Sequence, residues 1–219
     1  MRRIIILILF LQIYIQSLAN NEVQVTTSLS GIYWNHVWLS FFFGVLLTML
    51  FRYLNQRSMP ADQRSDAGLP LRGWIILLGV TLVIQFAIQG YAFWNSNFYL
   101  KSAWYPWEAA GGGMKLHLLF ILEMLMTLFA IAGTGALIYW FFGRRDIFPS
   151  MFIYYVGYLL LTQFILLIVY HITDLPADLL SVRHVILKQF FRMMVYAMIW
   201  VSFVMKSEDV KQTFVYPHG

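Results

Sequence analysis

Five polar side chains interrupt the apolar stretches of this chain, and their types could form a binding site inside a membrane. Glu123 and Arg192 are ionisable, and the other three are the glutamines Gln85, Gln89 and Gln163. A lone charge in hydrocarbon is costly, so a carboxylate or guanidinium there is expected to have a partner or to face water. Glu123 and Arg192 are the obvious pair, and the glutamine amides can complete their hydrogen bonding.

Depths estimated from the helical rise bring these side chains to a similar level. Glu123 lies about 12 Å, and Arg192 about 13 Å, below the same edge of their predicted spans. Lys188 lies one turn from Arg192 on the same helix face, and we expect His117 and His171 at the mouth. The pattern predicts an outward-open polar cavity that binds a headgroup, an anion or a partner's helix. A static tie between Glu123 and Arg192 is the alternative.

Other kinds of chemistry find little support in the sequence. Cysteine is absent, which excludes disulfides, thiolate metal sites and cysteine nucleophiles. No nucleophile-and-base motif, phosphate loop or dinucleotide fingerprint occurs. Four residues of one predicted loop could in principle ligate a metal, but their spacing matches no tight motif: His171, Asp174, Asp178 and His184. We expect no metal and no cofactor, identify no catalytic residue, and favour a role other than catalysis.

The elements that must position these residues are transmembrane helices. The chain has 219 residues, of which 60% are hydrophobic and only 11% charged, whereas about a quarter of the residues of a soluble domain are charged. Five apolar runs are predicted to span the membrane: about His36–Leu54, Gly73–Trp94, Lys115–Phe142, Ser150–His171 and Val185–Lys206. The predicted fold is an all-α polytopic bundle of four core transmembrane helices, preceded by one or two N-terminal helices.

Basic residues predict the orientation of these spans. Ten of the fifteen lie on one side: Arg2, Arg3, Arg52, Arg57, Arg64, Arg72, Arg144, Arg145, Lys206 and Lys211. By the positive-inside rule this side is cytoplasmic, so we expect a multi-pass protein of the bacterial inner membrane with a cytoplasmic C-terminus. No stretch outside the apolar runs is long enough to fold a nucleic-acid-binding face.

An aromatic cluster follows the span that ends at Trp94. It comprises Trp94, Tyr99, Trp104, Tyr105 and Trp107. Tryptophan and tyrosine rings gather where a membrane meets water, so an interfacial belt explains the cluster. A surface that docks a partner protein is the alternative.

From Leu71 onward the chain resembles a known family of membrane proteins. The matching pieces are Leu71-Arg72-Gly73-Trp74, Glu123, Phe148-Pro149, Ile199-Trp200 and the closing stretch from Val210 to Val215. They resemble the bacterial family called domain of unknown function 2569. The resemblance implies a four-helix membrane unit and no assigned reaction.

We therefore expect three parts and a non-enzymatic role. Residues 1–19 are a signal peptide or an uncleaved first helix, 20–70 hold an external segment, one transmembrane helix and a cytoplasmic linker, and 71–219 form the four-helix unit. The expected function is that of a membrane accessory protein or complex subunit whose polar cavity binds a partner protein or lipid headgroups. A small transporter that uses Glu123 and Arg192 as a gated pair is the alternative.

Overall fold

The computed structural model describes residues 31–58, 71, 73–101, 113–172 and 180–214. Within these ranges there are six α-helices and one isolated β-bridge, between Ile32 and Leu100. The helices are α2 (Trp34–Arg57), α3 (Trp74–Ser96), α5 (Gly113–Phe142), α6 (Phe148–Ile172), α7 (Leu180–Lys206) and α8 (Glu208–Phe214). The prediction of an all-α fold is confirmed.

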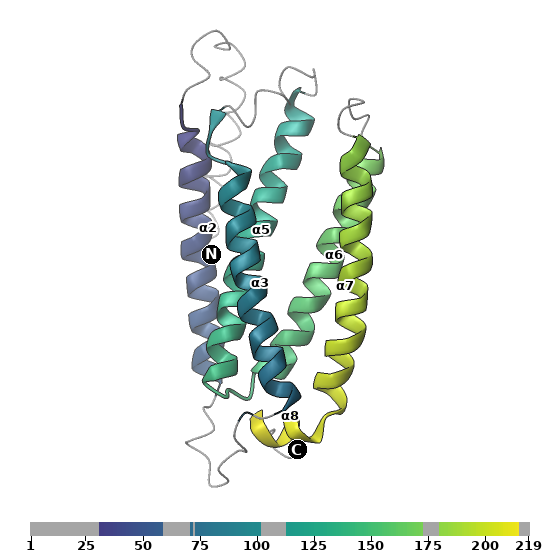
Figure 1. The fold of residues 1–219 in the computed structure, drawn as a ribbon. Coiled ribbons are helices and arrows are strands. Elements are labelled where there is room, and N and C mark those ends of the chain that lie inside the picture. Colours follow the sequence, from purple (N-terminus) through teal and green to yellow (C-terminus); the bar gives the residue numbers. More distant parts are fainter. Residues whose placement is uncertain (1–30, 59–70, 72, 102–112, 173–179, 215–219) are drawn as a thin grey trace.

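The five longer helices of the described residues are long and apolar enough to cross a membrane. They correspond to the five predicted spans, and consecutive ones run in opposite directions (Figure 1). Large apolar side chains are exposed along all of them, among them Phe41, Ile88, Leu122, Leu161 and Met198. Such surfaces belong in lipid, and the chain is a multi-pass membrane protein.

Some predicted features lie outside the described residues. They are the N-terminal segment 1–19, most of the predicted linker after α2, and the aromatic residues Trp104, Tyr105 and Trp107. The division of the chain into three parts therefore stays a prediction.

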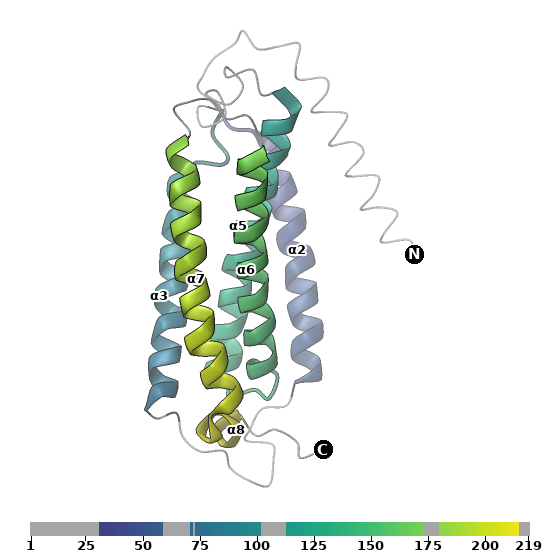
Figure 2. The same ribbon diagram turned by 90° about the vertical axis from the view of Figure 1, so that its right-hand side faces the viewer.

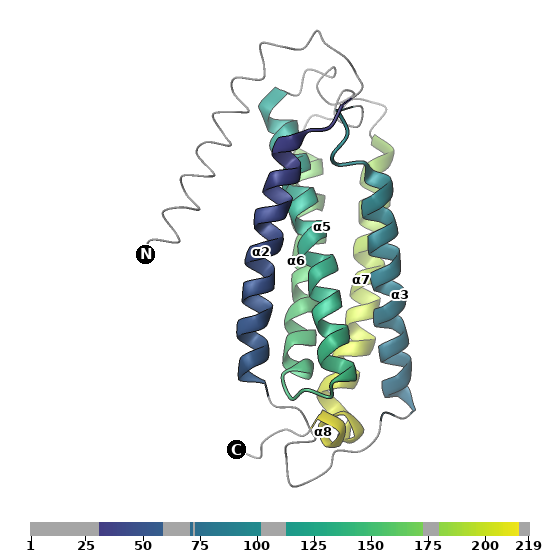
Figure 3. The ribbon, with the colours of Figure 1, turned by 90° about the vertical axis from the view of Figure 1, so that its left-hand side faces the viewer.

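Helix α5 is central to the bundle. It packs against α3, α2 and α6, whereas α7 packs chiefly along α6, beside which it lies in Figures 1 and 2. The short helix α8 lies across the end of the bundle at which α3 and α6 begin (Figures 1 and 3). We call this the α8 end, and we call the opposite end, where α2 begins, the far end.

The buried core is concentrated toward the α8 end. Phe141 of α5, Phe148 of α6 and Phe214 of α8 are almost completely buried. The ring of Phe148 stacks on that of Phe214 with centroids 4.7 Å apart and meets the ring of Phe141 edge-on at 5.1 Å. Aromatic rings stabilise such arrangements beyond the area they bury. Helix α8 thus closes one end of the bundle with an aromatic side chain.

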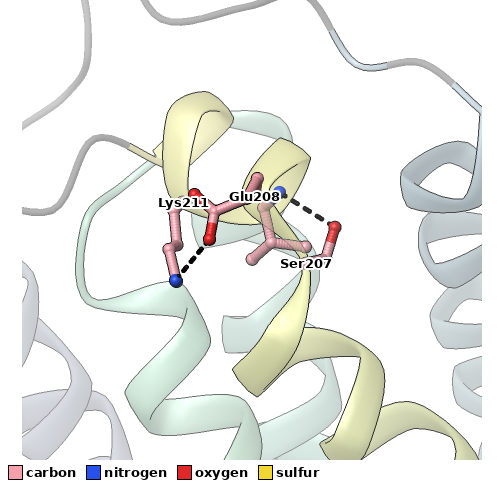
Figure 4. Close-up of polar contacts among 4 residues, drawn as sticks. Ser207, Glu208 and Lys211 are labelled. Atoms are coloured by element: carbon pink, nitrogen blue, oxygen red, sulfur yellow. Dashed lines mark hydrogen bonds and ion pairs between the residues drawn. The ribbon is translucent and has the colours of Figure 1, made fainter.

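Local polar contacts start α8 directly after α7. The Val210 backbone N–H donates to Oγ of Ser207 at 3.4 Å, as expected of a serine that caps a helix N-terminus. Lys211 Nζ forms an ion pair of 2.7 Å with Glu208 Oε1 (Figure 4). These contacts turn the chain sharply, so that Val210, Thr213 and Phe214 are buried against the bundle.

A residue with positive φ lies at each end of α3. Gly73, in the motif that carries the family resemblance, has φ 57° and ψ −129° at the N-cap, a conformation that only glycine adopts without strain. At the other end Asn97 is left-handed, with φ 52° and ψ 34°, and its N–H donates to the Trp94 carbonyl. Left-handed residues end helices in this way.

Helix α2 is tied to the bundle at its C-terminal end. The Arg145 guanidinium, from the turn between α5 and α6, donates to the Asn55 carbonyl at 3.3 Å, to the Ser58 carbonyl at 3.1 Å and to Ser58 Oγ at 3.0 Å. Trp140 Nε1 donates to Asn55 Oδ1 at 3.3 Å. Between its ends α2 buries few side chains, of which Leu47 is one.

Candidate functional site

Among the described residues, the far half of the bundle buries fewer apolar side chains than the α8 half does. The large core cluster lies toward the α8 end, and the far half has two small ones, of which one comprises Leu119, Leu166 and Ile186 and the other is centred on Ile121. Glu123 and Lys188 lie in this half, where the described residues form only small buried clusters. A polar group in such a region is easier to reach from outside than one in the aromatic core.

Helix α7 presents two cations on its surface. Lys188 and Arg192 are both exposed, and so is Gln189 between them. Arg192 lies about 5 Å from the middle of the Val185–Lys206 span. An arginine at the centre of a membrane helix costs about 2.5–3.5 kcal/mol on insertion scales. These exposed cations therefore need water or an acceptor group next to them.

Glu123 lies farther from the α8 end than Arg192 does. It is half-buried on α5, about 28 Å from the α8 end of that helix, whereas Arg192 lies about 21 Å from the α8 end of α7. Helix α7 packs chiefly along α6, and α5 packs on α3, α2 and α6. Pairing of Glu123 with Arg192 stays a prediction.

Gln89 takes part in a hydrogen-bonded cluster that joins three helices. Its Nε2 donates to the Tyr155 hydroxyl at 3.1 Å, and Thr134 Oγ1 donates to Gln89 Oε1 at 2.8 Å. The hydroxyls of Thr134 and Tyr155 are 2.5 Å apart. When Tyr155 donates to Thr134, each of the three groups donates one hydrogen bond and accepts another. We call these three residues the polar hub.

The polar hub lies deeper than we estimated for Gln89. Thr134 is about 12 Å from the α8 end of α5, and Tyr155 about 10 Å from the start of α6. The Gln89 amide therefore faces the interior of the bundle, toward residues in the α8 halves of α5 and α6. Gly133 of α5 leaves room for the Tyr155 ring of α6, because a Cβ at this position would lie 2.9 Å from that ring. Sequence reasoning missed Thr134 and Tyr155.

Several buried polar atoms of the described residues have no hydrogen-bond partner, and two of them lie on α6 and α7. These two are Oε1 of Gln163 on α6 and the hydroxyl of Tyr196 on α7. The Tyr196 side chain lies near Thr81 of α3, whose own hydroxyl donates to the Leu78 carbonyl. Gln85, one turn beyond Thr81, is half-buried. Buried polar groups without partners are costly, so these two atoms weaken the packing of α6 and α7.

His117 has a neighbour that sequence reasoning did not identify. The ring of His36, which is completely buried at the start of α2, lies 5.4 Å from the His117 ring of α5. Tyr33 lies 4.9 Å from His36 and 6.2 Å from His117, measured between ring centroids. Each histidine lies at the start of a span that runs toward the α8 end. This shared position in the sequence could have indicated that the two side chains are neighbours. The side chain of His171 lies outside the described residues.

The segment after α3 covers this histidine pair. The Tyr33 N–H donates to the Tyr99 carbonyl at 2.9 Å, and Lys101 Nζ lies 5.8 Å from the Tyr33 ring centroid. Tyr99 thus helps to fasten the start of α2, whereas Trp94 is strongly exposed, as a ring at a membrane surface would be. Among the described residues no three His, Asp or Glu side chains gather as a metal site would require.

Comparison with known proteins places the chain in a family. Residues 69–215 match the model of the family described as "Protein of unknown function (DUF2569)". These residues include α3, α5, α6, α7 and α8, whereas α2 precedes them. The chain matches no curated protein and no solved structure. Since the family model matches well over half of the chain, from the glycine-capped start of α3 through α8, the protein is a member of the DUF2569 family.

Proposed function

We propose that this protein is a non-enzymatic accessory protein or subunit of a membrane complex, whose far half binds a polar group of a partner protein or of lipid headgroups. One observation carries the proposal: Lys188 and Arg192 are exposed on α7 within the span. Both acidic side chains and headgroup phosphates supply the acceptor oxygens that these cations need. The exposed apolar residues Phe191 and Val195 beside them offer packing surface for a neighbouring helix.

The far end faces outward in this proposal. Arg52, Arg57, Arg144, Arg145, Lys206 and Lys211 all lie at or near the α8 end. Basic residues favour the cytoplasmic side, which supports a cytoplasmic C-terminus and a bacterial inner-membrane location. The polar side chains of the far half then lie in the outer half of the bilayer, where an extracytoplasmic partner or an outer-leaflet headgroup reaches them.

Arg192→Met is expected to remove the bound partner while the bundle stays folded. We would purify the chain from its native membrane in mild detergent, record an absorbance spectrum and identify co-purifying molecules by mass spectrometry. Lys206→Met is the matched control, because it removes an exposed cation from the end of the same helix. Removing one partner of a desolvated charge pair lowers affinity by roughly tenfold or more, so the amount of co-purified partner should fall by that factor in Arg192→Met alone.

The same purification separates the possible outcomes. A stoichiometric protein that depends on Arg192 supports the accessory role, and a retained anionic lipid that depends on Arg192 supports the headgroup form of the proposal. A wild-type protein that purifies alone contradicts it and favours the transport alternative. Retention of the partner by Arg192→Met contradicts the role of the exposed cations.

A further inference from the structure

A separate groove runs between α2 and α5. Its volume is about 260 Å³, and it is lined by Gly44, Leu47 and Phe51 of α2 and by Leu128, Ile131 and Ala132 of α5, together with two hydroxyl residues of α2. Gly44 is exposed, and a Cβ there would meet no atom within 4 Å. The groove is therefore open toward the surroundings of the bundle.

The lining of the groove suits a hydrocarbon chain. Its α2 residues run from Ser40 to Phe51, about 16 Å along the helix axis and centred on the middle of the span. Both hydroxyls are already engaged: Ser40 Oγ contacts Met124 Sδ at 3.8 Å, and Thr48 Oγ1 donates to the Gly44 carbonyl at 2.8 Å. Because both hydroxyls of the lining have partners, an apolar ligand leaves neither of them unsatisfied.

The groove is too small for another transmembrane helix. A helix is at least about 10 Å across with its side chains, so a 16 Å length of it occupies several times the volume of the groove. A single flexible chain fits a narrow groove of this length. Lipid acyl chains surround a membrane protein at this depth.

Positive charge lies at the α8 end of the same groove. Arg52 directly follows the lining residue Phe51 and is exposed. Arg145 bridges from the α5–α6 turn to the C-terminal end of α2, and its hydrogen-bond acceptors there are neutral carbonyl and hydroxyl oxygens. Arg144 precedes Arg145 in the turn. Asp146 follows Arg145, and its negative charge offsets one of the three arginine charges. Guanidinium groups at headgroup depth match a phosphate.

We propose that this groove binds an anionic phospholipid, with an acyl chain between α2 and α5 and the phosphate at Arg52, Arg144 and Arg145. The acyl chain gains van der Waals contacts with the groove lining, and the preference for an anionic headgroup comes from the basic end. This site lies apart from Lys188 and Arg192 and does not depend on the proposed function. The bound lipid would fill the space between α2 and α5 and hold α2 against the helices of the family unit.

Gly44→Leu tests the proposal by filling the groove. The matched control is Gly157→Leu on α6, where a Cβ likewise meets nothing within 4 Å and which lies outside the groove. Each variant is reconstituted in vesicles of phosphatidylethanolamine and phosphatidylglycerol, extracted in mild detergent and analysed by native mass spectrometry. We expect wild type and Gly157→Leu to retain one phosphatidylglycerol, and Gly44→Leu to retain about tenfold less, because the leucine side chain takes the place of the acyl chain against the groove lining.

Arg52→Gln tests the headgroup separately. It should lower the preference for phosphatidylglycerol over phosphatidylethanolamine about fivefold, the contribution of one basic residue at an anionic surface. Equal thermal unfolding of the variants and wild type confirms that the fold is intact. Equal lipid retention by Gly44→Leu and wild type would overturn the proposal, as would a lipid that shows no preference for an anionic headgroup. A protein segment cross-linked into the groove in place of lipid would overturn it as well.

Discussion

Gly79→Ala is expected to destabilise the folded bundle by about 1–3 kcal/mol, because it overpacks a close contact between α3 and α5. A Cβ at this position would lie 2.5 Å from Cε1 and 2.9 Å from Cζ of the Phe141 ring. That ring is almost completely buried, and the rings of Phe148 and Phe214 lie 5.1 and 5.7 Å from it. It therefore has no room to move aside, and the clash outweighs the gain of about 1 kcal/mol in helix propensity.

The control for this substitution lies on the same helix. A Cβ at Gly90 would meet nothing within 4 Å, so Gly90→Ala should leave stability unchanged or raise it by about 0.5–1 kcal/mol. Thermal unfolding in detergent, followed by tryptophan fluorescence, compares the two variants. Adding Phe141→Leu to Gly79→Ala should recover part of the loss, because the smaller side chain makes room. Equal unfolding temperatures for Gly79→Ala and Gly90→Ala would show that the two helices approach less closely than the structure indicates.

Thr134→Val should cost about 1–3 kcal/mol, the penalty for leaving buried polar groups without partners. Valine has nearly the shape of threonine, so the change removes the hydroxyl and little else. Thr134 is completely buried, and its loss breaks two sides of the polar hub, leaving Gln89 Oε1 and the Tyr155 hydroxyl to find other partners. The Ala130 carbonyl, 3.1 Å from the Tyr155 hydroxyl, can accept that hydrogen bond instead, which is why the expected cost stays within this range.

Two further variants show whether the hub acts as a unit. Thr134→Ser keeps the hydroxyl and should retain most of the stability. Thr127→Val lies on the same helix, where the threonine hydroxyl donates to the Glu123 carbonyl of its own helix at 2.8 Å, and it should change stability by less than about 0.5 kcal/mol. A double-mutant cycle between Thr134→Val and Tyr155→Phe should give a coupling of roughly 0.5–3 kcal/mol. Strict additivity would contradict a cooperative hub.

The membrane spans were predictable because each depends on one simple property. Every long helix comes from an apolar run long enough to cross the hydrocarbon core, and the helices differ from the predicted spans mainly at their ends. The α2 helix, for example, begins at Trp34 and ends at Arg57, where the sequence predicted 36–54. Helix pairing was not predictable, because lipid-facing and helix-facing residues are equally apolar. That α7 packs chiefly along α6, and that α2 leaves a groove against α5, required the structure.

The candidate site was predictable only where strongly polar residues interrupt an apolar run. Arg192 and Gln89 were identified in this way. Thr134 was not, since threonine is common in membrane helices and usually bonds to its own helix backbone. His36 was missed because it stands at the very start of a span, where polar residues are expected. The sequence placed Gln89 in the outer half, whereas its partners Thr134 and Tyr155 lie in the α8 halves of their helices.

Cysteine accessibility tests the central claim, that α7 presents a polar face in the far half. The chain has no cysteine, so Arg192→Cys and Phe191→Cys each introduce a single thiol. Both positions are exposed and neighbouring in depth, but they point about 100° apart around the helix. Because a thiol reacts as the thiolate, which lipid disfavours, we expect a membrane-impermeant maleimide, added to the outer side of reconstituted vesicles, to label Arg192→Cys about tenfold faster or more. Equal, slow labelling at both positions would show that this face lies in lipid and would contradict the proposed site.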